Sequence, residues 1–433
     1  MREADVLIIG GGLIGLLTAV ELADRGARVV VLEKDDVGFE QSCRSVAAIN
    51  LPGGAPSARM SLLRSSAEQW ANFETRWGYG VDLNADGWYI VIENELDRQW
   101  LEVERSTWQA TAGYPESSLL NVSEARARFP QMQGHFVELD VRHGGHVDAF
   151  MVMRALTQVA RDRNIEVRCG EMVRGFQVGG DRVLAVTTVK NRYAPSLVVI
   201  AAGLWSPDLC NQLGFHIPMQ RVRAPAAETG PMPPGTIPGF LRGATFGAKQ
   251  NRNGTVRITG GYRISAMLHD LSLRDGRDLG IWLPALWQNR KDVSFRLDVK
   301  ALGMELTSVL AGLVRDGDMR FPQRYEPLSS PRDRERQLAD LAGLIPLLRH
   351  ARVHRYFSGV MDLLPDLEPV LGQVPGTTNV YIAGGFSGHG YMYGPGACAA
   401  MAELIWTGRS EVDIEPYRPE RLLGPLRMRK QIF

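Results

Sequence analysis

Three glycines and one acid near the start of the chain have the spacing of a nucleotide-binding turn. Gly10, Gly12 and Gly15 follow an apolar run, and Glu33 ends a second apolar run at 29–32. In this pattern the first glycine permits a tight turn, the second lets the backbone approach a pyrophosphate, and the third lets a helix pack on the strand. The helix N-terminus offers its N–H groups and dipole to phosphates. Glu33 would hydrogen-bond the adenosine ribose, which favours FAD or NAD over NADP.

A second glycine-rich turn lies near the other end of the chain. An apolar run at 379–384 leads into the turn at 385–390, and an Ala- and Met-rich helix continues to Trp406. Such a turn presents another helix N-terminus, which stabilises negative charge. An isoalloxazine ring that takes up electrons carries that charge near N1 and O2, so the two turns together indicate FAD. The alternative is a second, purely structural turn between strand and helix.

These turns require strands and helices to hold them, and the apolar runs predict an α/β chain. The run 197–206 has the composition of a buried parallel strand that brings backbone close to a cofactor. Asp148 has the position of an N-cap for a helix over 149–163. Residues 264–325 show no strand alternation, and we expect a helical insertion there, over the substrate side.

Composition and charge argue against several other classes of function and location. The 433 residues are enough for two domains, and a net charge of +1 without charge runs argues against nucleic acid as a partner. No apolar run reaches the roughly 18 residues of a membrane span. Four scattered cysteines without C-x-x-C spacing predict a reducing compartment and no metal site. Because the chain passes directly into its first strand, with no signal-peptide pattern, we expect a cytoplasmic protein.

Over most of its length the chain resembles the D-amino acid oxidase-like family of FAD-dependent amine oxidoreductases. The segments that carry the resemblance are Gly10-x-Gly12-x-x-Gly15 with Glu33, Ser42–Ser45, Gly145–Asp148, Val199–Ser206 and Gly385–Gly390. Within the family, 356–366 and 369–372 look most like the beta subunits of sarcosine oxidases and of related proline dehydrogenases.

The resemblance implies a fold and a division into domains. The expected fold is α/β, α+β overall, with a Rossmann-like FAD-binding domain and a second, sheet-based substrate domain. The FAD-binding domain would comprise 1–80, 144–216 and 355–433. The substrate domain would comprise 81–143 and 217–354, the latter with the insertion at 264–325.

The turns and the resemblance together give a set of residues expected to contact FAD. They are Gly10, Gly12, Leu13, Ile14, Gly15, Glu33, Lys34, Ser42, Arg44, Ser45, Val173, Ala202, Gly203, Trp205, Gly359, Gly385, Ser387, Gly388, His389, Gly390, Tyr391 and Met392. The family cysteine that attaches flavin has no counterpart near 350–360, so we expect noncovalent FAD.

The implied reaction is the oxidation of an amine or of an N-substituted or imino amino acid. A hydride would leave the carbon next to nitrogen for the flavin, the product would be an imine, and oxygen or another acceptor would take the electrons. Expected catalytic residues are His389, Arg44, Tyr391 and Arg263.

Two cations of the family pattern are replaced in this chain. Sarcosine-oxidase-like members often carry a lysine at the position of Met392, and many relatives have an arginine at the position of Met361 or Asp362. Either Arg44 or Arg263 holds a substrate carboxylate instead, or the recognised end of the substrate is not a small α-carboxylate.

Two other functions stay open on the sequence. The chain has the features of a beta-like subunit that works only in a hetero-oligomer, and a homo-oligomer is equally compatible with it. An FAD-dependent monooxygenase is disfavoured, because we find no second G-x-G-x-x-G for a nicotinamide nucleotide.

Overall fold

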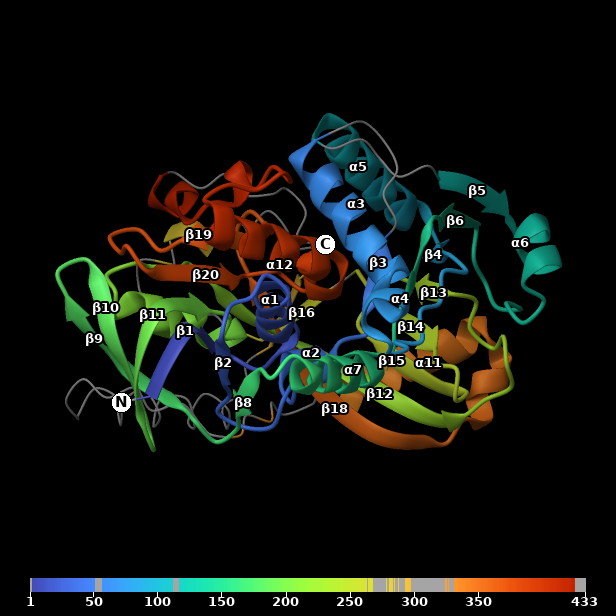
Figure 1. The fold of residues 1–433 in the computed structure, drawn as a ribbon. Helices are drawn as coiled ribbons and strands as arrows, with labels where there is room; N and C mark the ends of the chain where they lie inside the picture. The colour runs from blue at the N-terminus through green and yellow to red at the C-terminus, as the bar shows by residue number, and fades with distance from the viewer. Residues whose placement is uncertain are drawn as a thin grey trace.

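A computed structural model gives the fold of this chain (Figure 1). The residues it describes are 2–50, 57–111, 117–262, 264–267, 278, 280–282, 284, 287, 293–296, 324, 326 and 331–424.

The first of two large sheets has eight strands and a parallel centre. Its order is β19-β20-β11-β1-β2-β8, with the antiparallel ribbon β9-β10 attached to β11. The strands are β1 (Arg2–Ile9), β2 (Val29–Leu32), β8 (Glu166–Arg168), β9 (Val173–Gly179), β10 (Arg182–Thr188), β11 (Arg192–Ile200), β19 (Val370–Gln373) and β20 (Val380–Gly384). Ile8 lies opposite Val31 on one side and Val199 on the other. The paired segments of β1, β2 and β11 at 6–9, 29–32 and 197–200 are apolar because both faces of the sheet are covered there.

Helices cover one face of this sheet and the β9-β10 ribbon covers the other. Against the helices pack Val6 and Ile8, whereas Leu7 and Ile9 belong to the opposite cluster, with Val183 of the ribbon. The helices of this layer are α1 (Leu13–Ala23), α7 (Ala149–Asp162), α12 (Gly390–Thr407) and α3 (Ala58–Ala71), with α4 (Phe73–Trp77) following α3. This is a Rossmann-like arrangement, as expected from the sequence (Figure 1).

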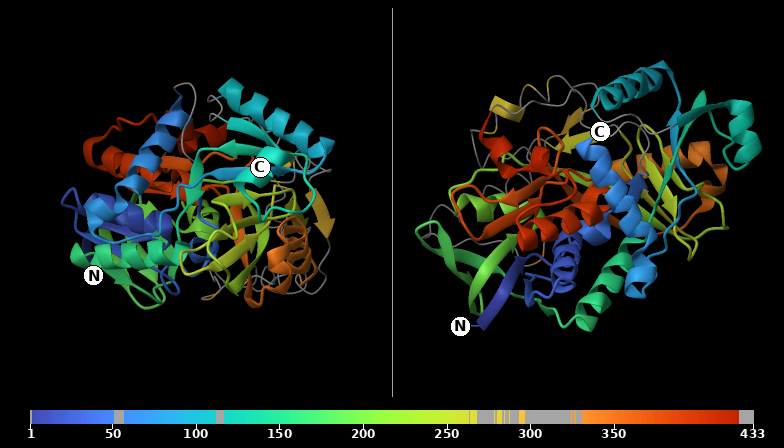
Figure 2. Two further views of the ribbon diagram at one scale, coloured as in Figure 1. Left: turned by 90° about the vertical axis from the view of Figure 1, so that its right-hand side faces the viewer. Right: turned by 45° about the horizontal axis from the view of Figure 1, so that its top comes forward.

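The second large sheet also has eight strands, in the order β18-β12-β15-β14-β13-β4-β6-β5. They are β4 (Trp88–Ile92), β5 (Ser117–Asn121), β6 (Glu138–Arg142), β12 (Gln220–Pro231), β13 (Phe240–Arg242), β14 (Gly247–Gln250), β15 (Thr255–Thr259) and β18 (Val353–Leu363). Neighbouring strands are antiparallel except for the parallel pair β4 and β13. The two views of Figure 2 show this sheet beside the first one.

The remaining elements are short or cover the second sheet. The helices are α2 (Gln41–Arg44), α5 (Glu95–Thr111), α6 (Val122–Arg128), α8 (Ser206–Asn211) and α11 (Pro331–Leu344). The described 3-10 turns are Gly203–Trp205, Pro346–His350, Glu415–Tyr417 and Pro419–Leu423. Two small two-stranded sheets pair β3 (Ala48–Asn50) with β7 (Gly144–His146), and β16 (Ile264–Met267) with β17 (Val293–Arg296). Helix α11 packs on β12 and β15.

The two faces of the second sheet have different partners. Leu241, Ala248 and Ile258 pack in the cluster that contains α11, whereas Trp88, Ile90 and Phe240 pack toward α3 and α12. Since side chains alternate along a strand, the residues between the α11-facing ones point toward the first sheet. The second sheet therefore turns part of this face toward the first sheet, while Trp100 and Leu101 of α5 pack on another part of it.

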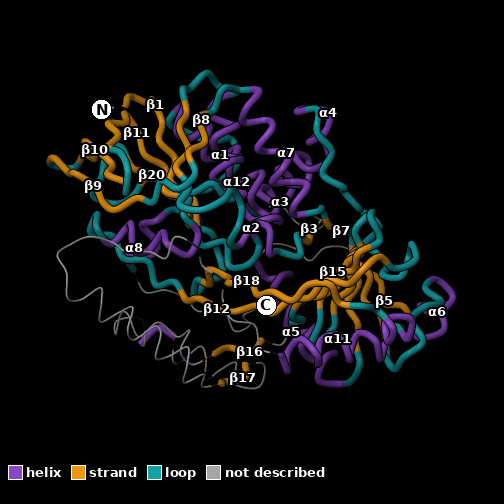
Figure 3. Tube along the Cα trace, turned by 90° about the horizontal axis from the view of Figure 1, so that it is seen from below, coloured by secondary structure: helices purple, strands orange, loops and turns teal. Residues whose placement is uncertain are grey.

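The domain boundaries drawn from sequence can be compared with the sheets. Segments 144–216 and 370–384 supply strands to the first sheet, and segments 81–143 and 217–259 supply strands to the second. Strand β18 begins at Val353 and pairs along β12, so the second sheet extends into the segment assigned to the FAD-binding domain (Figure 3). The described part of the insertion at 264–325 includes the paired strands β16 and β17, so the expectation of a helical insertion without strands is wrong for this part.

Candidate active site

A cavity with about 1480 Å³ of empty space lies where the two sheets meet. The first sheet contributes the ends of β1, β2 and β20 with the turns that follow them, and the second sheet contributes residues of β12, β15 and β18. In an open parallel sheet, ligands bind at the carboxyl ends of the strands. The cavity occupies this position.

The first glycine turn forms one wall of the cavity. A side chain at Gly10 would place its Cβ 2.3 Å from the carbonyl oxygen of Ala201, and Gly10 has a φ of +114°. A Cβ at Gly15 would lie 1.9 Å from the Gly10 oxygen, so α1 packs directly on the turn. Gly12 is the N-cap of α1 and provides no side-chain cap, and the Leu13 N–H donates to the Ser42 hydroxyl at 2.9 Å. The α1 N-terminus thus faces the cavity with its backbone.

Glu33 sits at the end of β2 and lines the same cavity. Its carboxylate accepts hydrogen bonds from the N–H groups of Gly11 at 2.7 Å and Asp35 at 2.8 Å. Burial raises the pKa of Glu33, and these two backbone donors oppose the rise. The acid is therefore held in one orientation beside the glycine turn, where a ribose would lie.

A group of three side chains closes the cavity next to η1, the 3-10 turn Gly203–Trp205. The Trp205 indole donates to the Glu40 carboxylate at 2.9 Å, and the Lys34 ammonium, which pairs with Glu40, lies 5.0 Å from the centre of the Trp205 ring. Glu40 carries no glycine or motif signal, and the sequence reasoning missed it.

Arg44 lines the cavity, but its guanidinium is bonded to backbone. It donates to the carbonyl oxygens of Phe39 at 3.1 Å and Ser358 at 2.9 Å, and it lies 3.7 Å from the Glu326 carboxylate. Burial lowers the pKa of Arg44. These contacts join the loop after β2 to β18, so Arg44 connects the two sheets at the cavity wall.

The second glycine turn lines the same cavity as the first. His389 is the N-cap of α12 without a side-chain cap, and Gly388, Gly390 and Tyr391 line the cavity. Underneath, the Ser387 hydroxyl accepts the Leu364 N–H at 3.0 Å. Two helix N-termini therefore face one cavity, as the two sequence turns predicted for a pyrophosphate and a flavin.

Asp362 holds the second glycine turn in place through hydrogen bonds. Its carboxylate accepts the Phe386 N–H at 3.1 Å, and its backbone carbonyl accepts the Ser387 N–H at 3.2 Å. The Gln41 side chain and the Gly388 backbone also hydrogen-bond to the carboxylate. Burial raises the pKa of Asp362 to about 6 despite these donors. The sequence analysis singled out the residue but did not place it in the site.

Of the expected catalytic residues, Arg44 and Tyr391 line the cavity and His389 does not. The Tyr391 hydroxyl donates to the Ser42 carbonyl oxygen at 3.0 Å, and its ring stacks on Trp70 at 6.0 Å. His389 lies behind the lining, where burial and the nearby charges of Arg242 and Arg59 lower its pKa to about 4. Arg263 lies outside the described residues.

Most of the expected FAD-contacting residues line the cavity. Those that do are Gly10, Gly12, Leu13, Ile14, Glu33, Lys34, Ser42, Arg44, Ser45, Val173, Ala202, Gly203, Trp205, Gly359, Gly388, Gly390 and Tyr391. Those that lie behind the lining are Gly15, Gly385, Ser387, His389 and Met392.

In the described part of the chain, no helix has the length and apolarity to cross a bilayer, and no cluster of His, Cys, Asp and Glu has a metal-binding arrangement.

Solved structures with the same fold are numerous. The chain superposes on an L-amino acid deaminase from Proteus myxofaciens with a TM-score of 0.82 at 19% identity, covering 97% of this chain and 94% of that one. It superposes on the L-proline dehydrogenase from P. horikoshii with a TM-score of 0.75 at 21% identity, covering 98% and 100%. At these identities the likeness concerns the fold.

Sequence comparison extends over nearly the whole chain. A glycine oxidase from Pseudomonas putida is 25% identical over 97% of this chain and 99% of its own length. A monomeric sarcosine oxidase from Streptomyces avermitilis is 26% identical, with 96% and 97% covered. The beta subunit of a sarcosine oxidase from Rhizobium meliloti is 22% identical, with 96% and 88% covered.

The family profile described as DAO, FAD dependent oxidoreductase, matches residues 5–404. The match includes both glycine turns, Glu33 and the strands of the second sheet that reach the cavity. It confirms the resemblance drawn from the sequence motifs. The chain belongs to the DAO family of FAD-dependent oxidoreductases.

Proposed function

We propose that this oxidoreductase oxidises an amine or an amino acid, including N-substituted and imino acids, at the carbon next to nitrogen. The observation that carries the proposal is the composition of the cavity. Two helix N-termini without side-chain caps line it, together with strands of a separate sheet. The names of the relatives, which are amino acid and N-methyl amino acid oxidases and dehydrogenases, support the substrate class.

The residues of the cavity fit FAD. The α1 N-terminus at Gly12 and Leu13 would hold the pyrophosphate, Glu33 the ribose, and the α12 N-terminus at Gly390 the electron-rich edge of the flavin. Bound there, FAD would supply a two-electron acceptor for a hydride. The clash of a Cβ at Gly10 with the Ala201 backbone explains why the first position of this turn must be glycine.

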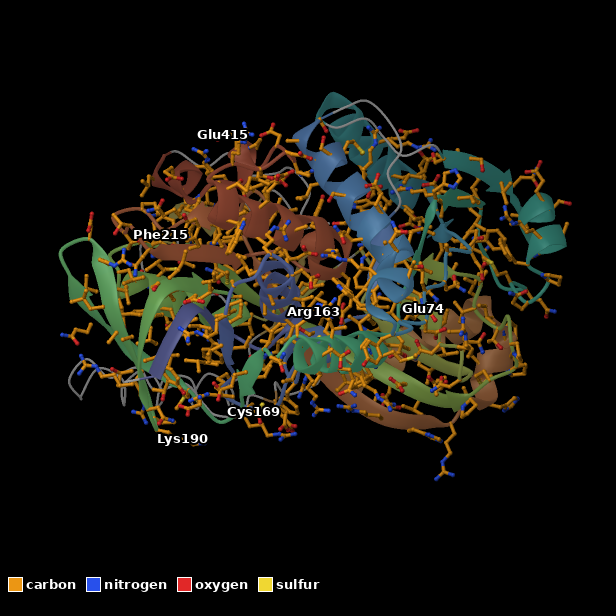
Figure 4. The ribbon with its side chains drawn as sticks, viewed as in Figure 1. Glu74, Arg163, Cys169, Lys190, Phe215 and Glu415 are labelled. Carbon is orange, nitrogen blue, oxygen red and sulfur yellow. The ribbon has the colours of Figure 1, made fainter. Side chains whose placement is uncertain are left out.

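We propose that FAD is bound noncovalently. All four cysteines lie in the described part of the chain and are free, and none of them lines the cavity. Figure 4 shows Cys169 next to β8, where its side chain is exposed. The same four free thiols support a cytoplasmic location, because a reducing compartment keeps cysteines unpaired.

The second sheet would prepare the substrate for oxidation. Ala224, Val360 and Met361 give the cavity an apolar wall, with Thr259 as a hydroxyl-bearing member. An apolar wall disfavours a charged ammonium, so it lowers the amine pKa and favours the neutral form. The nitrogen lone pair of the neutral amine then forms the C=N bond as the C–H bond breaks and its electron pair leaves with the hydrogen as hydride. The product is an iminium cation, which loses its N–H proton to water to give the imine where nitrogen carries a hydrogen. Water then hydrolyses the C=N bond.

The electron acceptor is oxygen or another oxidant, since the relatives include proteins named as oxidases and as dehydrogenases.

A hetero-oligomer is the alternative arrangement of the enzyme, supported by the relative that is a subunit of a sarcosine oxidase. Mass measurement of the enzyme purified from its native cells distinguishes a lone chain, a homo-oligomer and a complex with other subunits.

The test is visible absorbance of the FAD-loaded enzyme under anaerobic conditions. Primary amines, N-methyl amino acids and proline analogues are added separately, and bleaching of the flavin bands is expected with one of these classes. Subsequent addition of air restores the bands if oxygen is the acceptor. A protein that cannot be loaded with FAD, or FAD bands that no compound of the panel bleaches, would contradict the proposed function.

A further inference from the structure

The Asp362 carboxylate lies at the turn that precedes α12. It accepts the Phe386 N–H at 3.1 Å and a hydrogen bond from the Gly388 backbone. The backbone carbonyl of the same residue accepts the Ser387 N–H at 3.2 Å. Helix α12 begins directly after these residues, at Gly390. Asp362 is therefore bonded to the same turn whose N–H groups would hold the electron-rich edge of a flavin.

This carboxylate also borders the cofactor cavity. Asp362 lines the cavity and is 5% exposed. The Gln41 side chain, another member of the lining, hydrogen-bonds to the carboxylate from α2. A charge with so little water around it acts on its neighbours through a lower effective dielectric than a charge on the surface does. Ionised Asp362 would therefore act strongly on a charge that appears in the flavin.

The cations that face Asp362 from β12 are placed or bonded elsewhere. Arg221 lies opposite Asp362, and opposed residues share a face of the sheet. The Arg221 guanidinium donates to the Leu204 carbonyl oxygen at 3.1 Å and lies 3.3 Å from the Asp208 carboxylate. Arg223 shares this face, but it lies opposite the residue two positions before Asp362. The strand therefore brings cations near Asp362 without an ion pair to it among the described residues.

The other elements packed around Asp362 supply no ion pair either. On α2, Arg44 is bonded to backbone carbonyl oxygens, and burial raises the pKa of the Cys43 thiol to about 11, so that thiol is neutral at pH 7. The turn η1 carries no titratable side chain. In the second glycine turn, His389 is neutral at pH 7 because its pKa is lowered to about 4. Among the described residues, the Asp362 carboxylate is thus satisfied by hydrogen bonds and not by a counter-charge.

The proposed reaction changes the charge beside this carboxylate. A hydride carries two electrons and one proton, so a neutral flavin that accepts it gains one negative charge. Like charges that share a buried site repel each other, and a proton on one of them relieves the repulsion. The Asp362 carboxylate is in position to bind that proton, which would come from solvent water.

We propose that Asp362 sets how readily bound FAD accepts electrons, by opposing reduction while it is ionised and by binding a proton from water as reduction proceeds. Asp362 is a positioning residue, because it acts through its charge and through the turn it holds rather than on the substrate. The inference rests on the FAD position in the proposed function and is independent of the amine.

The protonation range of Asp362 suits this role. Burial already raises the pKa of Asp362 to about 6, and an added negative charge in the flavin would raise the pKa further, toward neutral pH. Asp362 is therefore ionised at pH 8 and protonated at pH 5, and the two conditions separate its charge from its hydrogen bonds.

The first experiment measures the reduction potential of the FAD-loaded enzyme at pH 5 and pH 8. Xanthine and xanthine oxidase supply electrons slowly under anaerobic conditions, and a reference dye reports the potential. On going from pH 5 to pH 8, Asp362→Asn should gain about tenfold over the wild type in the ratio of reduced to oxidised flavin, which is about 30 mV for a two-electron couple. Any constant effect of the substitution on the turn cancels in this comparison.

Asp366→Asn is the matched control. Asp366 is an acid of the same segment, but it pairs with Arg421 at 2.8 Å and does not line the cavity. The potential of this variant should change with pH as the wild-type potential does. A pH-dependent difference as large as that of Asp362→Asn would show that the effect is not specific to Asp362 and would overturn the inference.

A measurement on the wild type decides the question if Asp362→Asn does not retain FAD. Proton uptake on reduction is followed with a pH indicator in weakly buffered solution. Binding of a proton by Asp362 should add about half a proton per flavin near pH 6.5, relative to pH 9, if the flavin charge changes the affinity of Asp362 for the proton about tenfold. Equal proton uptake at both pH values would overturn the inference.

These measurements need no amine, so the inference and the proposed reaction fail separately. If no amine bleaches the flavin, the proposed reaction is contradicted, while the potentials still decide the role of Asp362. If an amine bleaches the flavin but the potentials of the wild type and Asp362→Asn change equally with pH, the reaction stands and the role of Asp362 is refuted.

Discussion

Replacing Asp362 by Asn should change how the stability of the protein depends on pH. The Asp362 side chain is 5% exposed, and burial raises its pKa from 3.8 to about 6. A difference of one in pKa corresponds to about 1.4 kcal/mol, so this rise of about 2 makes ionisation of Asp362 cost roughly 3 kcal/mol of folding free energy.

The sign follows from where the proton binds. The folded-state pKa lies above the unfolded one, so the folded protein holds the extra proton between about pH 4 and 6. The contribution of Asp362 to stability is nearly complete at about pH 3 and is lost as the pH rises through 6. Between about pH 3 and pH 7, the wild type should lose about 3 kcal/mol that the Asn variant does not lose.

The assay is urea unfolding of the FAD-free protein, followed by tryptophan fluorescence at several pH values. Asn keeps one acceptor oxygen for the Phe386 N–H but loses another, which shifts its stability by a constant amount at every pH. Asp362→Ala serves as a control, because alanine changes the free energy of unfolding by a different constant amount but, like asparagine, has no carboxyl group that titrates. Parallel pH profiles for the wild type and both variants would refute the reasoning.

Three further predictions concern the cavity and the core. Gly15→Ala places a Cβ 1.9 Å from the Gly10 oxygen, so FAD content and Tm should fall, whereas Gly343→Ala in helix α11, with open space around its Cβ, should lower neither. Glu33→Gln removes the charge expected to hold the ribose and should weaken FAD binding about tenfold, measured by quenching of FAD fluorescence; an unchanged Kd contradicts that role. Burial lowers the pKa of His146 from 6.5 to about 2, so below pH 6.5 the unfolded chain binds a proton that the folded protein does not bind. This difference lowers the free energy of unfolding by about 1.4 kcal/mol for each pH unit below 6.5. His146→Phe should remove this loss of stability, as measured by unfolding at several acidic pH values. Equal acid sensitivity of variant and wild type would count against it.

The sequence predicted the cofactor turns because their physics is local. A strand, three glycines and a helix within about ten residues leave few alternatives, and the observed φ of +114° at Gly10 is what a glycine there permits. The N-cap at Asp148 was predicted for the same reason, and its carboxylate accepts the N–H groups of Phe150 and Met151.

The substrate side was predicted less well because it depends on sheet register. Nothing in the sequence indicates that Ala224, Thr259 and Val360 line one cavity, since strand pairing joins residues through turns and long connections. For Arg44, the position in a motif loop was visible in the sequence, but its hydrogen bond to the distant Ser358 was not. Asp362 likewise becomes a site residue only through the turn it supports.

The first sheet has a consequence for how the protein is made. Its central strand β11 pairs with β1 on one side and with β20 on the other, although these neighbours come from opposite ends of the chain. During synthesis, β11 therefore leaves the ribosome long before β20, and its hydrogen-bonding edge stays open in the meantime. Such late, long-range closure is slow and favours aggregation of the nascent chain. We expect soluble yield to depend on chaperones, and C-terminal truncation before β20 to abolish FAD loading.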